Sequence, residues 1–151
     1  MHMRSEMPGA LAFDQAVTLP VVWITAHYCL DKAQLRSLQD VLVHAAAGGV
    51  GLISLEWVTR ARAATHATAG SPSKHATLRP CKDRCLSSSR DAAACTCLLS
   101  RHLRGRRLHC SVSALSNDFV SLSLGLLASR GTLLEIGKNA IWSYLRSLAA
   151  R

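Results

Sequence analysis

One segment constrains the fold of this chain more than any other. The apolar run Val41 to Ala45 leads directly into the small residues Ala46 to Gly51, and an amphipathic stretch begins at Val50. A short strand, a glycine-rich turn and a helix are the units from which parallel sheets with crossover helices are built. The segment therefore predicts a strand, turn and helix unit of an α/β protein.

The rest of the chain repeats this alternation of short apolar runs and helix-length stretches. Strands are expected over residues 41–45, 65–69, 85–87, 108–114 and 132–136. Helical structure is expected over residues 13–35, as one or two helices, and over 50–62, 72–79, 91–103 and 118–127. Pro20 is expected in a first helical turn. Together these elements predict an α/β fold, a Rossmann-like parallel sheet with flanking helices.

The chain length allows one ordinary domain. Its 151 residues are 49% hydrophobic and 18% charged, which is too apolar for a disordered chain. We expect a disordered start at residues 1–10, linking helices over 11–38, a Rossmann domain over 39–143 and a tail over 144–151. No apolar run approaches the roughly 20 residues of a membrane span, and no signal peptide is evident. We therefore expect a cytoplasmic protein without a membrane partner.

The formal net charge of +9 favours polyanionic partners in general, of which phosphate is the simplest. Aromatic residues make up 5% of the chain and do not alternate with basic ones, so we expect no nucleic-acid partner. The basic run over residues 101–109 is interpreted as a solvated helix end. Docking of an acidic carrier protein, or nucleic acid, is the alternative for that run.

Six cysteines are present, and four of them, at positions 81, 85, 95 and 97, could be considered as zinc ligands. Their spacings lack the paired C-x2-C knuckles typical of strong zinc sites. We expect no metal site and interpret most of the cysteines as buried thiols that behave as small hydrophobic residues.

The glycine-rich turn matches the dinucleotide fingerprint x-G-x-x-G, with Ala46 in place of the first glycine. Gly48 would let the backbone approach a pyrophosphate, and Gly51 would let the helix press against the sheet. The amino terminus of the helix would supply N–H donors and a partial positive charge. The alternative interpretation is a tight turn without a ligand.

The stretch about 20 residues beyond the glycines distinguishes NAD-binding from NADP-binding domains. An NAD-binding domain would place an acidic residue there, but residues 68–75 contain none. Ser71, at a helix start, and Lys74, one turn later, could instead bind a 2′-phosphate. This favours NADPH, with a solvated Lys74 on an exposed helix as the alternative.

At this point the sequence resembles a known family. The runs TLPVVWITAHYCL, VLVHAAAGGVG, ATAGSPSKHATLR, SSRD, LSNDFVSLSLGLLA and LLEIGKNAIWS are similar to the enoylreductase domain of modular polyketide synthases and animal fatty acid synthase. That domain belongs to the zinc-independent, quinone-oxidoreductase-like branch of the medium-chain dehydrogenase/reductase superfamily. The resemblance covers the chain from about Leu11 to Ser143.

The resemblance implies NADPH-dependent reduction of the α,β double bond of an enoyl thioester carried on an acyl carrier protein. It implies a catalytic proton donor at Lys138, with a lysine that only covers the cofactor cleft as the alternative. Arg90, in SSRD, is expected to steady the adenosine side or its loop. The other cofactor-binding positions implied are Thr25, Gly48, Gly49, Val50, Gly51, Ser71, Lys74, His75, Leu115 and Gly137.

The sequence also departs from the family pattern. Ser113 and His109 replace an Asn and an Asp, Arg62 and Lys82 stand at common glycine positions, and residues 129–131 replace a Pro-Gly-Gly turn. A glycine position filled by a larger residue would resist a positive φ.

The chain is about half as long as the family's domain and lacks the GroES-like barrel, so we expect a cofactor-binding fragment whose independent activity is doubtful. Remaining synthase domains or a second copy are possible partners. The alternative functions are a free-standing quinone or enone oxidoreductase and a non-catalytic, truncated Rossmann module.

Overall fold

The computed structural model describes residues 9–79, 85–115 and 118–137. Several predicted features lie outside these ranges. They are residues 1–8 of the expected disordered start, Cys81, Lys82, Lys138 and the tail over 144–151. The predictions made for them therefore remain predictions.

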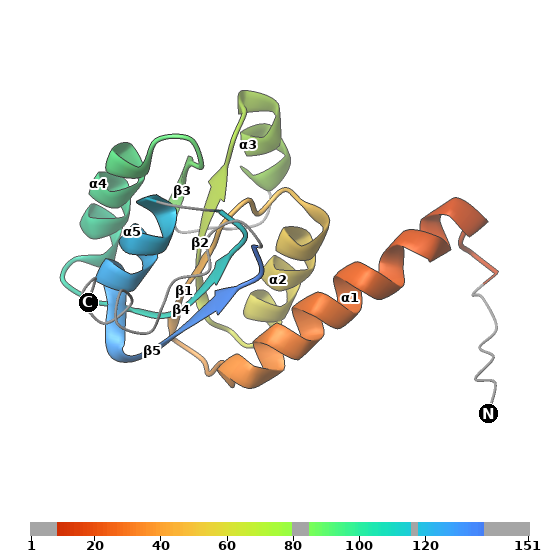
Figure 1. Cartoon of the computed structure of the whole chain (residues 1–151), viewed down its shortest axis with the longest axis horizontal. Helices are drawn as coiled ribbons and strands as arrows, with labels where there is room; N and C mark the ends of the chain where they lie inside the picture. Colours follow the sequence, from red (N-terminus) through yellow and green to blue (C-terminus); the bar gives the residue numbers. More distant parts are fainter. Residues whose placement is uncertain (1–8, 80–84, 116–117, 138–151) are drawn as a thin grey trace.

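A five-stranded sheet forms the centre of the molecule (Figure 1). Its strands are β1 (Asp40–Val43), β2 (Ala64–Ala69), β3 (Cys85–Ser88), β4 (Leu108–Ser113) and β5 (Leu127–Glu135). They lie in the order β3-β2-β1-β4-β5, and every neighbouring pair is parallel. The predicted Rossmann-like parallel sheet is confirmed.

Helices cover both faces of this sheet (Figure 1). They are α1 (Phe13–Ala33), α2 (Gly49–Arg60), α3 (Pro72–Leu78), α4 (Ala92–Leu103) and α5 (Asp118–Leu126). Val41 and Val43 of β1 pack in one buried cluster with α1 and α2, whereas Leu42 packs in another with α4 and α5. This alternation follows from the two-residue period of a strand, and it makes β1 fully buried on both faces.

Two predicted boundaries are wrong. Pro20 lies inside a single helix, α1, rather than in a first helical turn, because that helix begins at Phe13 with the Gln15 side chain accepting a hydrogen bond from the Ala12 N–H at 3.1 Å. The strand expected from Thr132 begins at Leu127, directly after α5, with a register shift in its pairing to β4. The strand β5 has more residues than β4 between the pairs on either side of this shift, and the extra residues accommodate it. Regular pairing resumes at Thr132, opposite Cys110.

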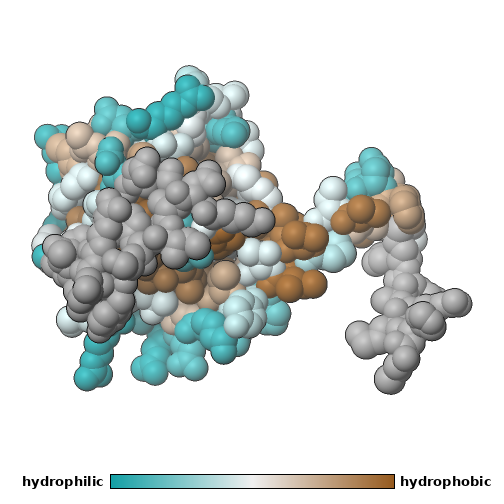
Figure 2. Space-filling view, in the orientation of Figure 1, coloured by the Kyte–Doolittle hydropathy of each residue, from teal (hydrophilic) through white to brown (hydrophobic). Residues whose placement is uncertain are grey.

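Helix α1 carries a row of large apolar side chains that no other described residue buries. Phe13, Val17, Val21, Ile24 and Tyr28 are 76%, 59%, 72%, 67% and 67% exposed, and their spacing places them along one side of the helix. Figure 2 shows apolar residues along the part of α1 that extends away from the sheet. Among residues 9–79, 85–115 and 118–137, no helix is both long and apolar enough to cross a membrane.

Arg62 adopts the left-handed conformation that its place in the family pattern predicts for glycine. Its φ is 54°, its N–H donates to the Thr59 carbonyl at 3.0 Å, and its own carbonyl accepts from Leu38 N–H at 3.0 Å. The two hydrogen bonds hold the residue between α2 and β2 in a conformation that is unfavourable for a side chain with a Cβ atom.

We predict that Arg62→Gly raises the free energy of unfolding by about 1 kcal/mol, because glycine reaches positive φ without the Cβ penalty. Urea denaturation measures the change. Arg60→Gly, inside the last turn of α2, is the matched control and is expected to lower stability by a similar amount. A loss of stability in Arg62→Gly would show that the left-handed turn carries no strain.

Candidate functional site

The candidate site lies where the strand order reverses direction. The chain leaves β1 toward α2 on one face of the sheet and leaves β4 toward α5 on the other, so the carboxyl ends of these two adjacent strands open a crevice. A hollow of about 220 Å³ occupies this position. Its lining residues are His44, Ala45, Gly48, Gly49, Val50, Gly51, Val112, Ala114 and Ile136.

The turn between β1 and α2 presents unused donors to this hollow. Gly48 N–H donates to the Ala45 carbonyl at 2.9 Å, and Gly49 begins the helix. Among the described residues, no hydrogen-bond acceptor faces the backbone N–H of Gly49, Val50 or Gly51. These amides and the positive end of the α2 dipole form an environment suited to a phosphate oxyanion.

Two of the glycines lie in close contact with neighbouring residues. A Cβ atom on Gly51 would lie 2.6 Å from both the Cα and the carbonyl oxygen of Ala46, which is closer than any real contact. A Cβ atom on Gly49 would lie 3.0 Å from a methyl group of Val22 on α1. Gly51 thus lets α2 start against the end of β1, whereas a methyl group on Gly49 would require only a shift of the Val22 side chain.

A buried hydrogen-bond network stabilises the turn between β1 and α2. His44 is 3% exposed, and its ring contacts Thr68 Oγ1 through Nδ1 at 3.3 Å and Ser123 Oγ through Nε2 at 2.9 Å. Thr68 Oγ1 also accepts from Ala45 N–H at 3.1 Å. Because Ala45 has a φ of 48°, this bond holds the first residue of the turn in its left-handed conformation.

The directions of these bonds assign the His44 tautomer. Ser123 donates its hydroxyl proton to the Phe119 carbonyl at 2.8 Å and accepts from Ser111 at 3.2 Å, so it must also accept from His44 Nε2. Nδ1 is then free to accept from the Thr68 hydroxyl. Every proton in the network has an acceptor only when the imidazole is neutral. Burial agrees, lowering the pKa of His44 to about 4.

The predicted 2′-phosphate residues lie around the carboxyl end of β2. Ser71 caps α3, its Oγ accepting from Lys74 N–H at 3.4 Å, and the Lys74 side chain is exposed. His75 is held differently, since its Nε2 hydrogen-bonds the Ala69 carbonyl at 2.9 Å. Arg90 reaches this loop from the end of β3: its Nε lies 3.5 Å from where a Gly70 Cβ would be. Two cations therefore flank the Ser71 cap.

Three further predicted residues, Thr25, Leu115 and Gly137, are not among the residues that line the hollow. Thr25 lies on α1, one turn beyond Val22, with its hydroxyl donating to the Val21 carbonyl at 2.7 Å. Leu115 follows β4, and its N–H donates to Ser113 Oγ at 3.3 Å. Gly137 follows β5, where a Cβ would lie 3.4 Å from the Ala114 carbonyl oxygen.

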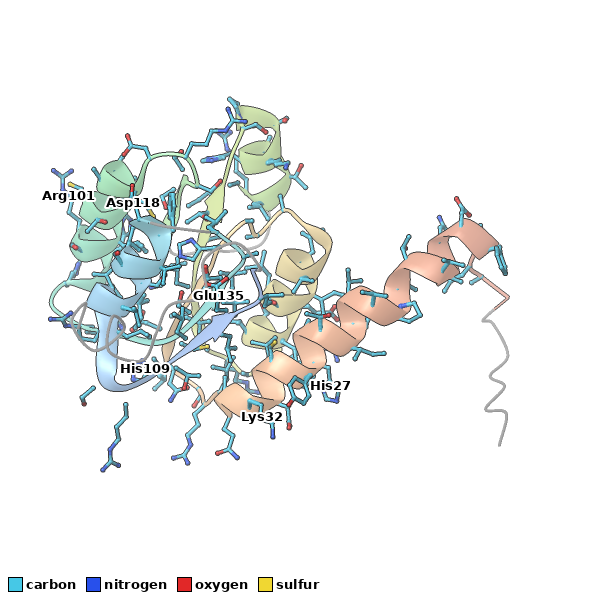
Figure 3. The ribbon with its side chains drawn as sticks, in the orientation of Figure 1. His27, Lys32, Arg101, His109, Asp118 and Glu135 are labelled. Carbon is cyan, nitrogen blue, oxygen red and sulfur yellow. The ribbon has the colours of Figure 1, made fainter. Side chains whose placement is uncertain are left out.

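Sequence reasoning missed two parts of this site. The network of His44, Thr68 and Ser123 was not predicted, although a histidine inside the apolar run 41–45 was a signal that a partner must exist. Glu135 was also missed. Its carboxylate accepts from Gly137 N–H at 2.7 Å and closes the loop after β5 (Figure 3), and burial raises its pKa.

The basic run and the described cysteines are not among the residues that line the hollow. Arg101 is on α4, on the other side of the molecule from His27 and Lys32 of α1 (Figure 3). Arg106 is paired with the buried Asp40 at 3.1 Å. Cys85, Cys95 and Cys110 are buried. Burial raises the pKa of Cys95, and it raises the pKa of Cys110 to about 12, so these two thiols are protonated at neutral pH. The described part of the chain contains no group of three or more residues placed to hold a metal ion.

No protein-family model matches the chain. Its sequence is 37% identical over 149 residues to the reducing polyketide synthase rdc5 of Metacordyceps chlamydosporia, a match that covers 96% of this chain and 6% of the synthase.

The chain is also similar in structure to solved proteins. CurK enoyl reductase superposes with a TM-score of 0.90 at 31% identity, covering 97% of this chain and 44% of that protein. The quinone oxidoreductase of Escherichia coli, solved as a complex with NADPH, superposes with a TM-score of 0.82 at 25% identity, covering 96% of this chain and 45% of that protein. The chain thus spans less than half the length of each of these proteins.

We predict that Gly51→Ala disrupts the turn, since its methyl group would overlap backbone atoms that cannot move aside. The expected result is a loss of about 2 kcal/mol or more in the free energy of unfolding. The control is Gly105→Ala, which has open space around its Cβ position and a positive φ, and is expected to cost about 1 kcal/mol. Equal effects of the two changes would contradict the close approach at Gly51.

We predict that acid destabilises the fold through His44. Its folded pKa, about 4, lies below the ordinary 6.5, so the unfolded chain binds the proton more readily. Its contribution is fully present above pH 6.5 and is lost as the pH falls toward 4, amounting to roughly 3 kcal/mol.

Urea denaturation across this pH range should show a shallower pH dependence in His44→Gln than in the parent chain. His102→Gln, at an exposed histidine of α4, should keep the parent slope. If His44→Gln also keeps it, His44 is not held neutral by the fold.

Proposed function

This chain belongs to the enoyl reductase domains of polyketide synthases, in the medium-chain dehydrogenase/reductase superfamily, and we propose that its crevice binds NADPH. The observation that carries the proposal is the set of open amides at Gly49, Val50 and Gly51, placed at the reversal of strand order. A pyrophosphate fits there because it supplies acceptors to those amides and negative charge to the helix end. The small side chains around the turn leave room for its approach.

The choice of NADPH over NADH rests on charge. Lys74 and Arg90 flank the Ser71 cap, and residues 68–79 contain no acidic side chain that would bind a ribose hydroxyl pair. An additional phosphate at this position would be offset by the two cations, whereas an unphosphorylated ribose would leave them without a counter-charge. The similar quinone oxidoreductase of Escherichia coli was solved as a complex with NADPH, which supports the proposal of this cofactor.

We propose that the reaction is the reduction of an enoyl thioester held on an acyl carrier protein. NADPH supplies the hydride. The residues of this chain would orient it: the glycine turn would hold the pyrophosphate, and Thr25 on α1 would lie toward the nicotinamide end. Lys138, outside the described residues, is our candidate for protonating the α-carbon after hydride transfer.

A free-standing quinone or enone oxidoreductase is the second candidate, because the Escherichia coli quinone oxidoreductase has the same fold over nearly all of this chain. The two candidates differ in substrate. Turnover of a carrier-bound enoyl thioester in preference to a small enone supports the synthase reaction, and the reverse preference supports the oxidoreductase. NADPH binding without turnover of either would identify a non-catalytic Rossmann module.

We propose that the apolar row on α1 is where further parts of the reductase or synthase pack. The five side chains from Phe13 to Tyr28 form an exposed apolar surface of the kind that marks protein contacts. The similar proteins contain more than half their length beyond the matched region, which supplies candidate partners. A cytoplasmic location fits the same context.

We predict that NADPH binds at least tenfold more tightly than NADH, and that Lys74→Ala removes most of this preference by weakening NADPH alone. Isothermal calorimetry measures both affinities. The matched control is Lys32→Ala on α1, whose ammonium lies 5.6 Å from the centre of the Tyr28 ring and which should leave both affinities unchanged. Equal affinities of the parent chain for the two cofactors would refute the 2′-phosphate assignment.

A further inference from the structure

A second hollow, of about 390 Å³, lies beside the turn that joins α4 to β4. The residues that the structure describes in its lining are Arg101, His102, Arg104 and Arg106, and all four are basic. We call it the basic hollow. Its volume is within the range of pockets that bind small molecules. A lining of this kind favours a negatively charged ligand.

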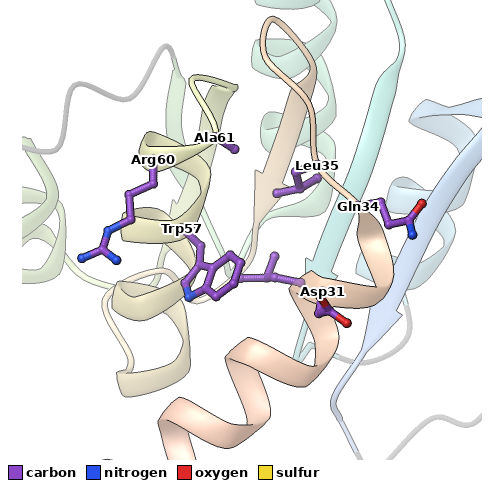
Figure 4. Close-up of a pocket in the computed structure, with 7 residues that line it drawn as sticks. Asp31, Gln34, Leu35, Trp57, Arg60 and Ala61 are labelled. Carbon is purple, nitrogen blue, oxygen red and sulfur yellow. The ribbon is translucent and has the colours of Figure 1, made fainter.

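The basic hollow differs in charge from the pocket between the ends of α1 and α2 (Figure 4). That pocket has a similar volume, about 350 Å³, but its lining contains Asp31 as well as Arg60. Arg60 is also paired with Glu56, Nη2 to Oε1 at 2.7 Å. Carboxylates therefore offset the one guanidinium of that pocket, and it provides a control for the basic hollow.

The turn after α4 brings the arginines together. Its residues Arg104 and Gly105 are both left-handed, with φ of 49° and 81°. The Arg104 N–H donates to the Ser100 carbonyl at 3.1 Å, and the Arg106 N–H donates to the Leu103 carbonyl at 2.9 Å. These bonds fix the backbone on both sides of Gly105, so Arg106 returns beside the last turn of the helix.

The Arg106 side chain is held in place by a buried carboxylate. Its Nη1 lies 3.1 Å from Asp40 Oδ2, and its Nε donates to the Leu103 carbonyl at 3.3 Å. Asp40 is 1% exposed, and its other oxygen, Oδ1, is 3.0 Å from His66 Nε2. A guanidinium has further N–H donors beyond those used in these two contacts. Arg106 therefore offers donors at a fixed position in the basic hollow.

The positive charge of the basic hollow is only partly offset. Among the described residues, Asp40 is the one carboxylate paired with a lining arginine, and the exposed Arg101 and Arg104 have no side-chain hydrogen bond or ion pair. The carboxyl end of the α4 dipole adds roughly half a negative charge. The three guanidinium groups are thus left with an excess of about 1.5 positive charges.

This excess matches one class of anion. A phosphate monoester carries about 1.5 to 2 negative charges at neutral pH, whereas a phosphodiester carries about one. Guanidinium groups also pair with phosphate oxygens through two parallel hydrogen bonds, because both groups present their atoms in a matching fork. The lining therefore fits a phosphate monoester better than a diester.

We propose that the basic hollow binds the phosphate group of a small phosphate monoester. Arg106, fixed by Asp40, donates from one side, and Arg101 and Arg104 donate from the last turn of α4. This goes beyond the solvated helix end that the sequence predicts for this run. The site is separate from the dinucleotide crevice, because β4, whose six residues span roughly 20 Å, has the crevice at its carboxyl end and the basic hollow at its amino end.

The test uses the full chain labelled with ¹⁵N and two probes of matched shape at constant ionic strength. Phenyl phosphate is a monoester, and methyl phenyl phosphate is the corresponding diester. Phenyl phosphate should produce saturable shifts of the backbone amides of Arg104, Gly105 and Arg106. It should bind there about tenfold more tightly than the diester, because it carries more charge and a further free oxygen. Binding of either probe in the crevice would be seen separately, at the amides of residues 49–51.

The variants separate this site from general attraction between charges. Arg104→Gln should weaken the binding of phenyl phosphate about tenfold by removing a charge-assisted contact, and Arg101→Gln should act in the same direction. Arg60→Gln, in the pocket of Figure 4, should leave the affinity unchanged. The shifts of the crevice amides on adding NADPH should be the same in all three variants, so failure here would not bear on the proposed cofactor.

Three results would each overturn the proposal. The first is equal affinity for the two probes, which a general polyanion surface predicts. The second is the absence of saturable shifts over residues 104–106, and the third is an unchanged affinity in both Arg101→Gln and Arg104→Gln.

Discussion

The close approach of α2 to the end of β1 is the constraint on which the rest of the structure depends. Gly51 sits so near the Ala46 backbone that no side chain fits, and only this contact lets the helix begin immediately beyond the strand. The same geometry leaves the first amides of α2 without acceptors and turns them toward the gap between β1 and β4. The close packing of α2 against β1 thus also creates a surface suited to binding an anion.

A second layer of polar contacts keeps this geometry in place. Neutral His44 joins β1, β2 and α5 through Thr68 and Ser123, and Thr68 in turn holds the Ala45 N–H at the start of the turn. The network is buried, so breaking it would leave donors and acceptors without water. Thr68 and Ser123 do not line the hollow, so the conformation of the phosphate turn depends in part on residues outside the proposed cofactor site.

The sequence predicted the architecture well because its main signals are local. The glycine pattern after residues 41–45, the Ser71 cap and the Asp91 cap each specify an element, and the structure has them. The prediction that Pro20 lies in a first helical turn was wrong because the fixed φ of proline is compatible with the interior of an exposed helix as well as with a helix start. The identity of the partners of His44 could not be predicted, since Thr68 and Ser123 are distant from it in the chain.

The central claim is that the β1–α2 turn binds the pyrophosphate of a nicotinamide dinucleotide. The most direct measurement is the change in backbone amide resonances of ¹⁵N-labelled protein as NADPH is added. The account predicts that the amides of Gly49, Val50 and Gly51 show the largest saturable shifts, because they donate to the phosphates. Saturable binding that leaves these three amides unshifted, or no binding at all to folded protein, would contradict it.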